Sequence, residues 1–145
     1  MATVREILAK KGSHVWSIAA EATVLQAARF MTEHTIGALL VLDGERIVGM
    51  FSERDILQRV VAEGRDPTQA TVGDVMTTEV ACCTPDTPLA EARGAMKNRR
   101  IRHLPVVDGD EHLLGIISIG DLNAFQVADQ EQTIFLMSEY IYGRV

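Results

Sequence analysis

The chain has 145 residues, and its 20 acidic side chains outnumber 14 basic ones, for a formal net charge of −6. This balance argues against non-specific nucleic-acid binding, which needs a basic surface, but it allows one small anion in a locally basic cleft. No stretch reaches the roughly 18–20 apolar residues of a membrane span, and residues 1–12 lack the apolar run of a signal peptide. The two cysteines, Cys82 and Cys83, are neighbours and match no disulfide or metal-ligand spacing. We therefore expect a cytoplasmic protein with no membrane partner, no nucleic-acid partner and no metal site.

Most of the chain consists of an internal sequence repeat with two copies. The segment IGALLVLD (36–43) aligns with IRHLPVVD (101–108), 65 residues further on, and VREIL (4–8) resembles VGDVM (72–76). After one extra residue in the second copy, GMFSERDI (49–56) aligns with GIISIGDL (115–122). A repeat of this kind indicates two similar structural units that bury a shared surface.

Each copy predicts the same order of elements. A short strand is followed by a helix with apolar residues at helical spacing, then by two apolar strands and a second helix. In the first copy, Asp43-Gly44 supplies the turn between the paired strands. The predicted strands are 14–19, 38–43 and 46–52 in the first copy, and 79–84, 103–108 and 113–119 in the second. The second helix of each copy lies within 54–64 or 120–130. The first helix carries Val24, Ala27, Ala28 and Met31 in one copy, and Leu89, Ala92 and Met96 in the other.

These elements predict a mixed α/β (α+β) fold built from two β-α-β-β-α motifs. A unit of about sixty residues is marginal alone, so we expect the copies to pack face to face with pseudo-twofold symmetry and a cleft between them. The expected division is 1–66 for the first motif with its N-terminal helix, 67–127 for the second motif, and 128–145 for a C-terminal extension. That extension continues a long helix whose apolar stripe contacts either a second subunit, our preferred interpretation, or its own chain.

The repeated Ser and Asp stand where a strand gives way to a helix. A helix N-terminus attracts anions, a carboxylate accepts hydrogen bonds from a ribose diol, and a hydroxyl can donate to a phosphate or sugar. Ser52 with Asp55, and Ser118 with Asp121, therefore suggest two small nucleotide-binding motifs. The alternative is that each Asp is an ordinary helix N-cap.

The duplicated motifs and IRHLPVVD resemble a tandem pair of CBS domains, a Bateman module, over residues 4 to 127. The resemblance implies that adenosyl ligands bind between the copies: AMP foremost, or ADP, ATP, NAD(H) or S-adenosylmethionine. It also implies a homodimer and a regulatory role. In the family the motif Asp holds the ribose, the Ser faces sugar or phosphate, and apolar strand residues enclose the base.

The resemblance implies two half-sites, each completed by the other copy. The first consists of Ser118, Asp121, Gly120 and Ile116, with Trp16 and Ile36 opposite. The second consists of Ser52, Asp55 and Met50, with Ala81 and Ile101 opposite. Pro105 belongs to the strand that also carries the family's basic pair. Trp16 has the alternative role of a core residue.

Arg102 and His103 match that basic pair, which faces phosphates in nucleotide-binding members of the family. The equivalent residues in the first copy are Gly37 and Ala38, so we expect the half-site with Asp55 to be the weaker one. Arg54 can compensate in part by reaching a phosphate. A lone His in an apolar strand can also be purely structural, which is the alternative for His103.

Three functions are compatible with these patterns. The first is a nucleotide sensor without catalysis, read by a separate and unknown partner protein. The second is a structural or dimerising module with empty clefts. The third is a nucleotide-processing enzyme, which we disfavour because the sequence shows no nucleophile beside a base and no phosphate-binding glycine loop.

Overall fold

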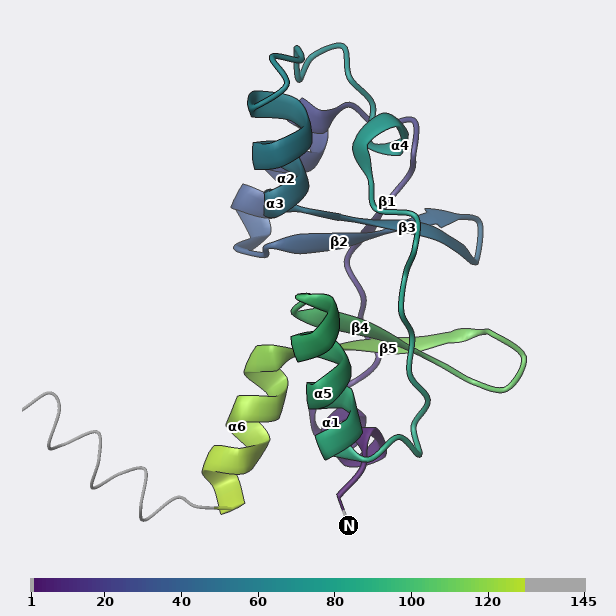
Figure 1. Cartoon of the computed structure of the whole chain (residues 1–145). Helices are drawn as coiled ribbons and strands as arrows, with labels where there is room; N and C mark the ends of the chain where they lie inside the picture. The colour runs from purple at the N-terminus through teal and green to yellow at the C-terminus, as the bar shows by residue number, and fades with distance from the viewer. Residues whose placement is uncertain (1, 130–145) are drawn as a thin grey trace, which may run out of the picture.

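The computed structural model describes residues 2–129 and confirms the mixed α/β fold (Figure 1). The prediction of a C-terminal extension over 128–145 falls outside the described residues, except for the last two residues of the final helix. The first part of the chain forms α1 (Val4–Lys11), β1 (Ser17–Ile18), α2 (Val24–His34), β2 (Ala38–Asp43), β3 (Arg46–Ser52), α3 (Glu53–Asp55) and the π-helix η1 (Ile56–Val61). The second part forms α4 (Val72–Val75), α5 (Leu89–Arg99), β4 (His103–Val107), β5 (Leu113–Ser118) and α6 (Ile119–Asp129).

The two sheets follow from the predicted hairpins. In the first sheet β1 pairs parallel to β2, and β2 pairs antiparallel to β3; in the second, β4 pairs antiparallel to β5. The strand predicted over 79–84 is reduced to one parallel bridge between Cys83 and Val106. Pro85, which has no N–H to donate, follows this bridge, and residues 79–81 line a cavity instead of pairing.

The repeat predicts which positions are buried. Each half has its own apolar core, and several aligned pairs of positions are at most 5% exposed in both copies. Because a shift of one residue would turn a strand's apolar side chains to the other face, this agreement confirms the register of the repeat. The aligned buried pairs are Ala27 and Ala92, Met31 and Met96, Leu39 and Leu104, and Val41 and Val106.

The short helix that opens each sequence copy packs in the core of the other half. Val4 and Ile7 of α1 are buried in the cluster that contains Leu104, whereas Val72 and Val75 of α4 are buried in the other cluster. Figure 1 shows α1, in purple, in the part of the molecule that contains β4, β5 and the green α5. Neither sequence copy therefore contains a complete core, and the expected unit 1–66 does not coincide with a structural half.

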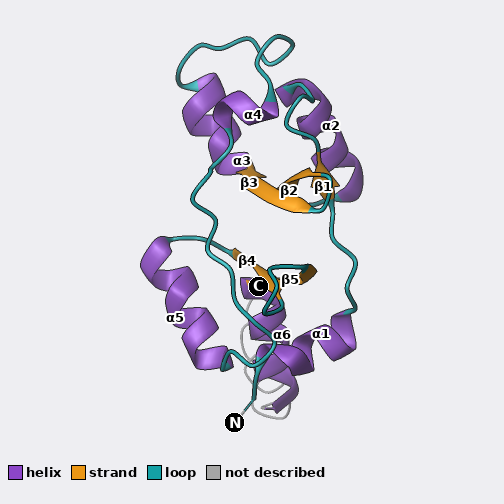
Figure 2. Cartoon of the chain, turned by 90° about the vertical axis from the view of Figure 1, so that its right-hand side faces the viewer, coloured by secondary structure: helices purple, strands orange, loops and turns teal. Residues whose placement is uncertain are grey.

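The two sheets face each other, and the helices lie on their outer sides (Figure 2). This is the predicted face-to-face arrangement of the two motifs. One contact between the halves is a hydrogen bond of 3.0 Å from the Arg54 guanidinium to the carbonyl of Arg100. Among the helices of residues 2–129, none has the length and apolar character needed to cross a membrane.

Candidate functional site

The motif Ser and Asp form a reciprocal helix cap in both halves. The backbone N–H of Ser52 donates to Asp55 Oδ2 (3.0 Å), and the N–H of Asp55 donates to Ser52 Oγ (3.4 Å). The same bonds join Ser118 and Asp121, at 2.8 and 3.1 Å. The Ser, not the Asp, is therefore the N-cap, which corrects the alternative interpretation of the motif. The cap holds each carboxylate in place through Oδ2.

A cavity of about 630 Å³ lies between the two halves at the cap of α3. Both halves contribute to its lining, and its volume falls within the range of roughly 300–1,000 Å³ that suits a small-molecule ligand. Met50, Val80, Ala81 and Ile101 supply apolar lining, and Asp55 supplies a carboxylate. The residues of the second half-site inferred from the sequence all line this cavity, namely Ser52, Asp55, Met50, Ala81 and Ile101.

The cavity is basic although the chain as a whole is acidic. Its lining contains five arginines and three acidic residues, while the whole chain carries a net charge of −6. Such a concentration of guanidinium groups suits a phosphate-bearing ligand. The arginines are Arg54, Arg59, Arg99, Arg100 and Arg102, and the acidic residues are Glu53, Asp55 and Glu79.

Sequence reasoning missed several of these lining residues. Arg59 lies one helical turn after Asp55, a spacing that could have identified it, and its Nε is 3.8 Å from Asp55 Oδ1. Thr77 donates to Asp55 Oδ1 at 3.2 Å, but it comes from the extended segment after α4, which carries no local signal. Arg99 and Arg100, at the C-terminal end of α5, also line the cavity.

The residues at the starts of β2 and β4, and those just before them, line the same cavity. Gly37 and Ala38 line it together with Arg102 and His103, so the basic pair is not confined to the half-site of its own copy. The expectation that Asp55 belongs to the weaker half-site assumed that Arg102 and His103 serve only the half-site of their own copy. The cavity lining places the basic pair in the same cavity as Asp55.

The first half-site is arranged differently. Lys11 Nζ lies 2.6 Å from Asp121 Oδ2 and 2.8 Å from the carbonyl oxygen of Ile116. Burial raises the pKa of Asp121, but hydrogen bonds from Lys11 and Ser118 outweigh it, and the net pKa is below the ordinary value. Asp121 is therefore an ionised partner of a lysine of the same chain.

The remaining residues inferred from the sequence lie apart from this cavity's lining. Trp16 stacks on His34 with ring centroids 4.1 Å apart, and it also meets Phe30 edge-on. This arrangement places Trp16 in an aromatic cluster of the first half. Ile36 packs against the first core, Pro105 is buried in β4, and Gly120 is exposed in the first turn of α6.

His103 lies between the two half-sites and carries a shifted pKa. Burial lowers this pKa from the ordinary 6.5, the Lys11 cation lowers it further, and Asp121 opposes both. Arg102 lowers it and Glu53 raises it, so the net shift is downward. The imidazole is thus neutral near pH 7 and accepts a proton less readily than in the unfolded chain.

We expect this shift to make the ligand-free protein less stable in mild acid. As the pH falls below 6.5, the unfolded chain protonates His103 before the folded chain does, so the free energy of unfolding falls. Lowering the pH from about 7.5 to about 5.5 should therefore reduce the melting temperature of the wild type more than that of His103→Gln. Calorimetric melts of both proteins at the two pH values test this, and equal losses would contradict it.

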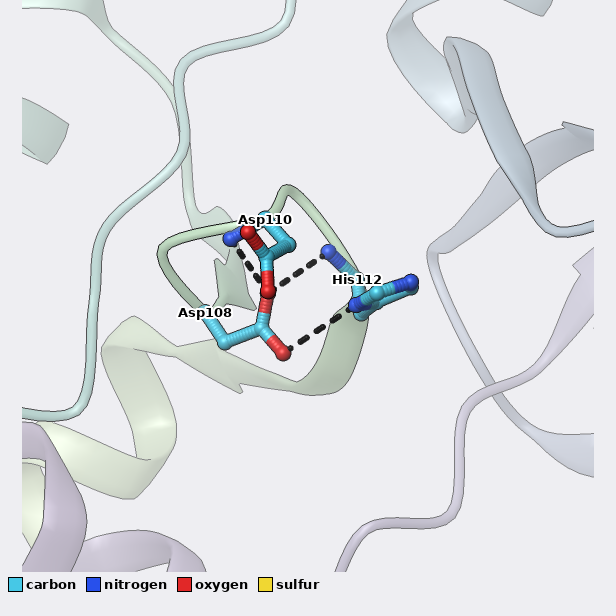
Figure 3. Close-up of side chains that lie close together, drawn as sticks. All are labelled: Asp108, Asp110 and His112. Atoms are coloured by element: carbon cyan, nitrogen blue, oxygen red, sulfur yellow. Dashed lines mark hydrogen bonds and ion pairs between the residues drawn. The ribbon is translucent and has the colours of Figure 1, made fainter.

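A separate cluster occupies the loop between β4 and β5 (Figure 3). Asp108 Oδ1 accepts hydrogen bonds of 2.9 Å from the backbone N–H groups of both Asp110 and His112, and Asp108 Oδ2 lies 3.3 Å from His112 Nδ1. Possible metal-ligand atoms of the three residues lie within 4.8 Å of one another. The hydrogen bonds account for the arrangement as a turn, in which a short polar side chain bonds to the backbone that follows it.

Comparison with known proteins identifies the class to which this fold belongs. The CBS domain family model matches residues 4–62 and 72–127, and the chain belongs to this family as a tandem CBS pair. A CBS-domain protein from Burkholderia ambifaria is 39% identical, with a TM-score of 0.85 over 89% of this chain and 96% of that one. The CBS domain-containing protein YhcV of Bacillus subtilis is 36% identical over 81% of this chain and 83% of its own length. The CBS domain pair of MJ0100, in complex with 5′-methylthioadenosine and S-adenosyl-L-methionine, shares the fold at 23% identity, with a TM-score of 0.72 over 89% of this chain and 98% of that one.

Proposed function

We propose that this CBS pair binds a phosphate-bearing adenosine nucleotide, with AMP the foremost candidate, in the cavity that contains Asp55. The observation that carries the proposal is the combination, in one cavity of about 630 Å³, of a carboxylate, apolar walls and a basic strand. A nucleotide offers the three matching parts: a sugar diol, a flat base and an anionic phosphate. The basic lining favours phosphate-bearing ligands over S-adenosylmethionine, whose sulfonium is a cation.

Each part of the nucleotide has a proposed partner. The Asp55 carboxylate accepts hydrogen bonds from the ribose hydroxyls, and the apolar side chains of Met50, Ala81 and Ile101 enclose the base. Arg102 and His103 face the phosphate. Arg54 already donates to the Arg100 carbonyl, so it ties the two halves together at the edge of the cavity.

The role proposed for this binding is regulatory, without turnover of the ligand. Asp55 is held in a helix cap and Ser52 Oγ donates to it at 3.2 Å, so both polar groups of the motif are committed to structure and recognition. A nucleotide between the halves would stabilise their packing, and a separate protein would read that change. The homodimer and the cytoplasmic location predicted from the sequence remain proposals, and sedimentation analysis would test the first.

A thermal-shift panel tests the proposed ligand class. AMP, ADP, ATP and NAD are compared with adenosine and S-adenosylmethionine at equal concentration. At a hundredfold excess over the dissociation constant, the preferred ligand should stabilise the protein by about 2.7 kcal/mol. We expect the phosphate-bearing compounds to raise the melting temperature more than adenosine or S-adenosylmethionine. A panel with no response from any compound would refute the proposal.

A further inference from the structure

Different side chains contact the two motif aspartates, Asp55 and Asp121. At Asp121, the Lys11 ammonium bonds to the carboxylate (2.6 Å) and to the carbonyl of Ile116 (2.8 Å). At Asp55, the Thr77 hydroxyl donates to the carboxylate (3.2 Å), and the Thr77 N–H donates to the carbonyl of Met50 (2.8 Å). Met50 and Ile116 are equivalent in the repeat. One motif carboxylate therefore bonds a cation, through Oδ2, and the other bonds a neutral hydroxyl, through Oδ1.

The difference arises from the lengths of the exchanged helices. α1 runs from Val4 to Lys11, about two turns, and places Lys11 beside β5. α4 ends at Val75 after about one turn, and the chain then extends along β3, where Thr77 bridges Met50. In the alignment of the two copies, the position of Lys11 is occupied by Glu79. The sequence therefore supplies no cation to Asp55 from this segment.

We infer that Lys11 determines which half-site accepts the nucleotide. The inference rests on the proposed function and assigns the ligand to the half-site with Asp55 alone. The Lys11 ammonium neutralises the Asp121 carboxylate through a short charge-assisted hydrogen bond to Oδ2, so a ribose diol has to compete with a cation there. At Asp55 a ribose diol competes only with a neutral hydroxyl, which bonds Oδ1 at 3.2 Å. Because the Thr77 hydroxyl both donates and accepts, it can rotate to bond the sugar.

Arg59 does not repeat the role of Lys11 at Asp55. Its Nε is 3.8 Å from Asp55 Oδ1, beyond hydrogen-bond distance, and its Nη1 donates to the carbonyls of Val75 and Met76 at 3.3 and 2.9 Å. The guanidinium is therefore held by the end of α4. It forms an ion pair with the Asp55 carboxylate at 3.8 Å but does not donate a hydrogen bond to it.

Titration calorimetry with AMP tests the inference on the full chain. We expect one AMP per chain for the wild type, and two for Lys11→Met, which keeps the aliphatic stem and removes the charge. Adding Asp121→Asn to Lys11→Met should abolish the second site. Lys10→Met is the matched control: it removes the same charge from the same helix, where Lys10 lies 6.0 Å from the Phe125 ring centroid, and should leave one AMP per chain.

The outcomes separate this inference from the proposed function. Two AMP molecules on the wild type, or one on both wild type and Lys11→Met, would overturn the role of Lys11 while the proposed function stands. If only Lys11→Met binds AMP, and Asp121→Asn removes that binding, Lys11 blocks the half-site as inferred but the assignment to Asp55 is wrong. If neither protein binds AMP, both the inference and the proposed function fail.

Carboxyl NMR gives a readout without ligand. Asp121 should titrate at higher pH in Lys11→Met than in the wild type, and an unchanged titration would also overturn the inference.

Discussion

Replacing Asp55 with Asn is expected to weaken AMP binding about tenfold to a hundredfold. The Asn side chain keeps the shape but loses the negative charge and one acceptor oxygen, so the ribose loses charge-assisted hydrogen bonds worth about 1.5–3 kcal/mol. About 1.4 kcal/mol corresponds to a factor of ten in the dissociation constant. Titration calorimetry at fixed pH and ionic strength measures the change directly.

Asp121→Asn is the matched control for this experiment. Asp121 occupies the same third position of a capped helix and makes the same backbone contact with its Ser, so both substitutions disturb a cap. Both variants keep the N-cap Ser, so the weakened cap should cost at most about 1 kcal/mol in thermal melts, and Asp121→Asn additionally loses the ion pair with Lys11. Only Asp55→Asn should lose affinity. Weakened binding in Asp121→Asn with intact binding in Asp55→Asn would show that the ligand occupies the other half-site.

Much of the fold was predictable because its signals are local. Apolar periodicity, the Asp43-Gly44 turn and the aligned motifs predicted both hairpins and the two aligned cores. The grouping of Ser52, Asp55 and Met50 with Ala81 and Ile101 required in addition the resemblance to CBS pairs, since physical patterns alone left the motif open between a ligand site and a helix cap. The structure shows that the cap is present, and the cap is also what orients the carboxylate.

The other features of the site depend on which segments, distant in the sequence, lie together in the fold, and no local sequence pattern encodes this. VREIL and VGDVM resemble each other, so the alignment could not show that α1 and α4 exchange halves. The exchange brings Lys11 to Asp121 across 110 positions of the chain. In the same way, the spacing of Arg102 and His103 within their strand could not show that they face the cavity of Asp55. The sequence-based ranking of the two half-sites depended on these placements.

The exchanged helices predict that the two halves unfold together. Phe51 is fully buried in the first core, beside Val72 and Val75 of α4, whereas Leu104 is buried in the second core, beside Val4 and Ile7 of α1. We expect Phe51→Ala to lower the free energy of unfolding by about 3–5 kcal/mol and Leu104→Ala by about 2–5 kcal/mol. These are the largest effects on stability expected here, since a domain of this size has only about 5–15 kcal/mol in total.

Trp16 makes the coupling measurable because it is the only tryptophan and belongs to the first half. Leu104→Ala lies in the other core, yet it should shift the urea midpoint of Trp16 fluorescence as far as that of far-ultraviolet circular dichroism. The reason is that the loss of the second core releases α1, which a short segment containing Trp16 joins to β1, and frees the cavity face of the first sheet. Independent halves would behave differently: Leu104→Ala would leave the fluorescence midpoint in place and add an earlier transition in the circular dichroism.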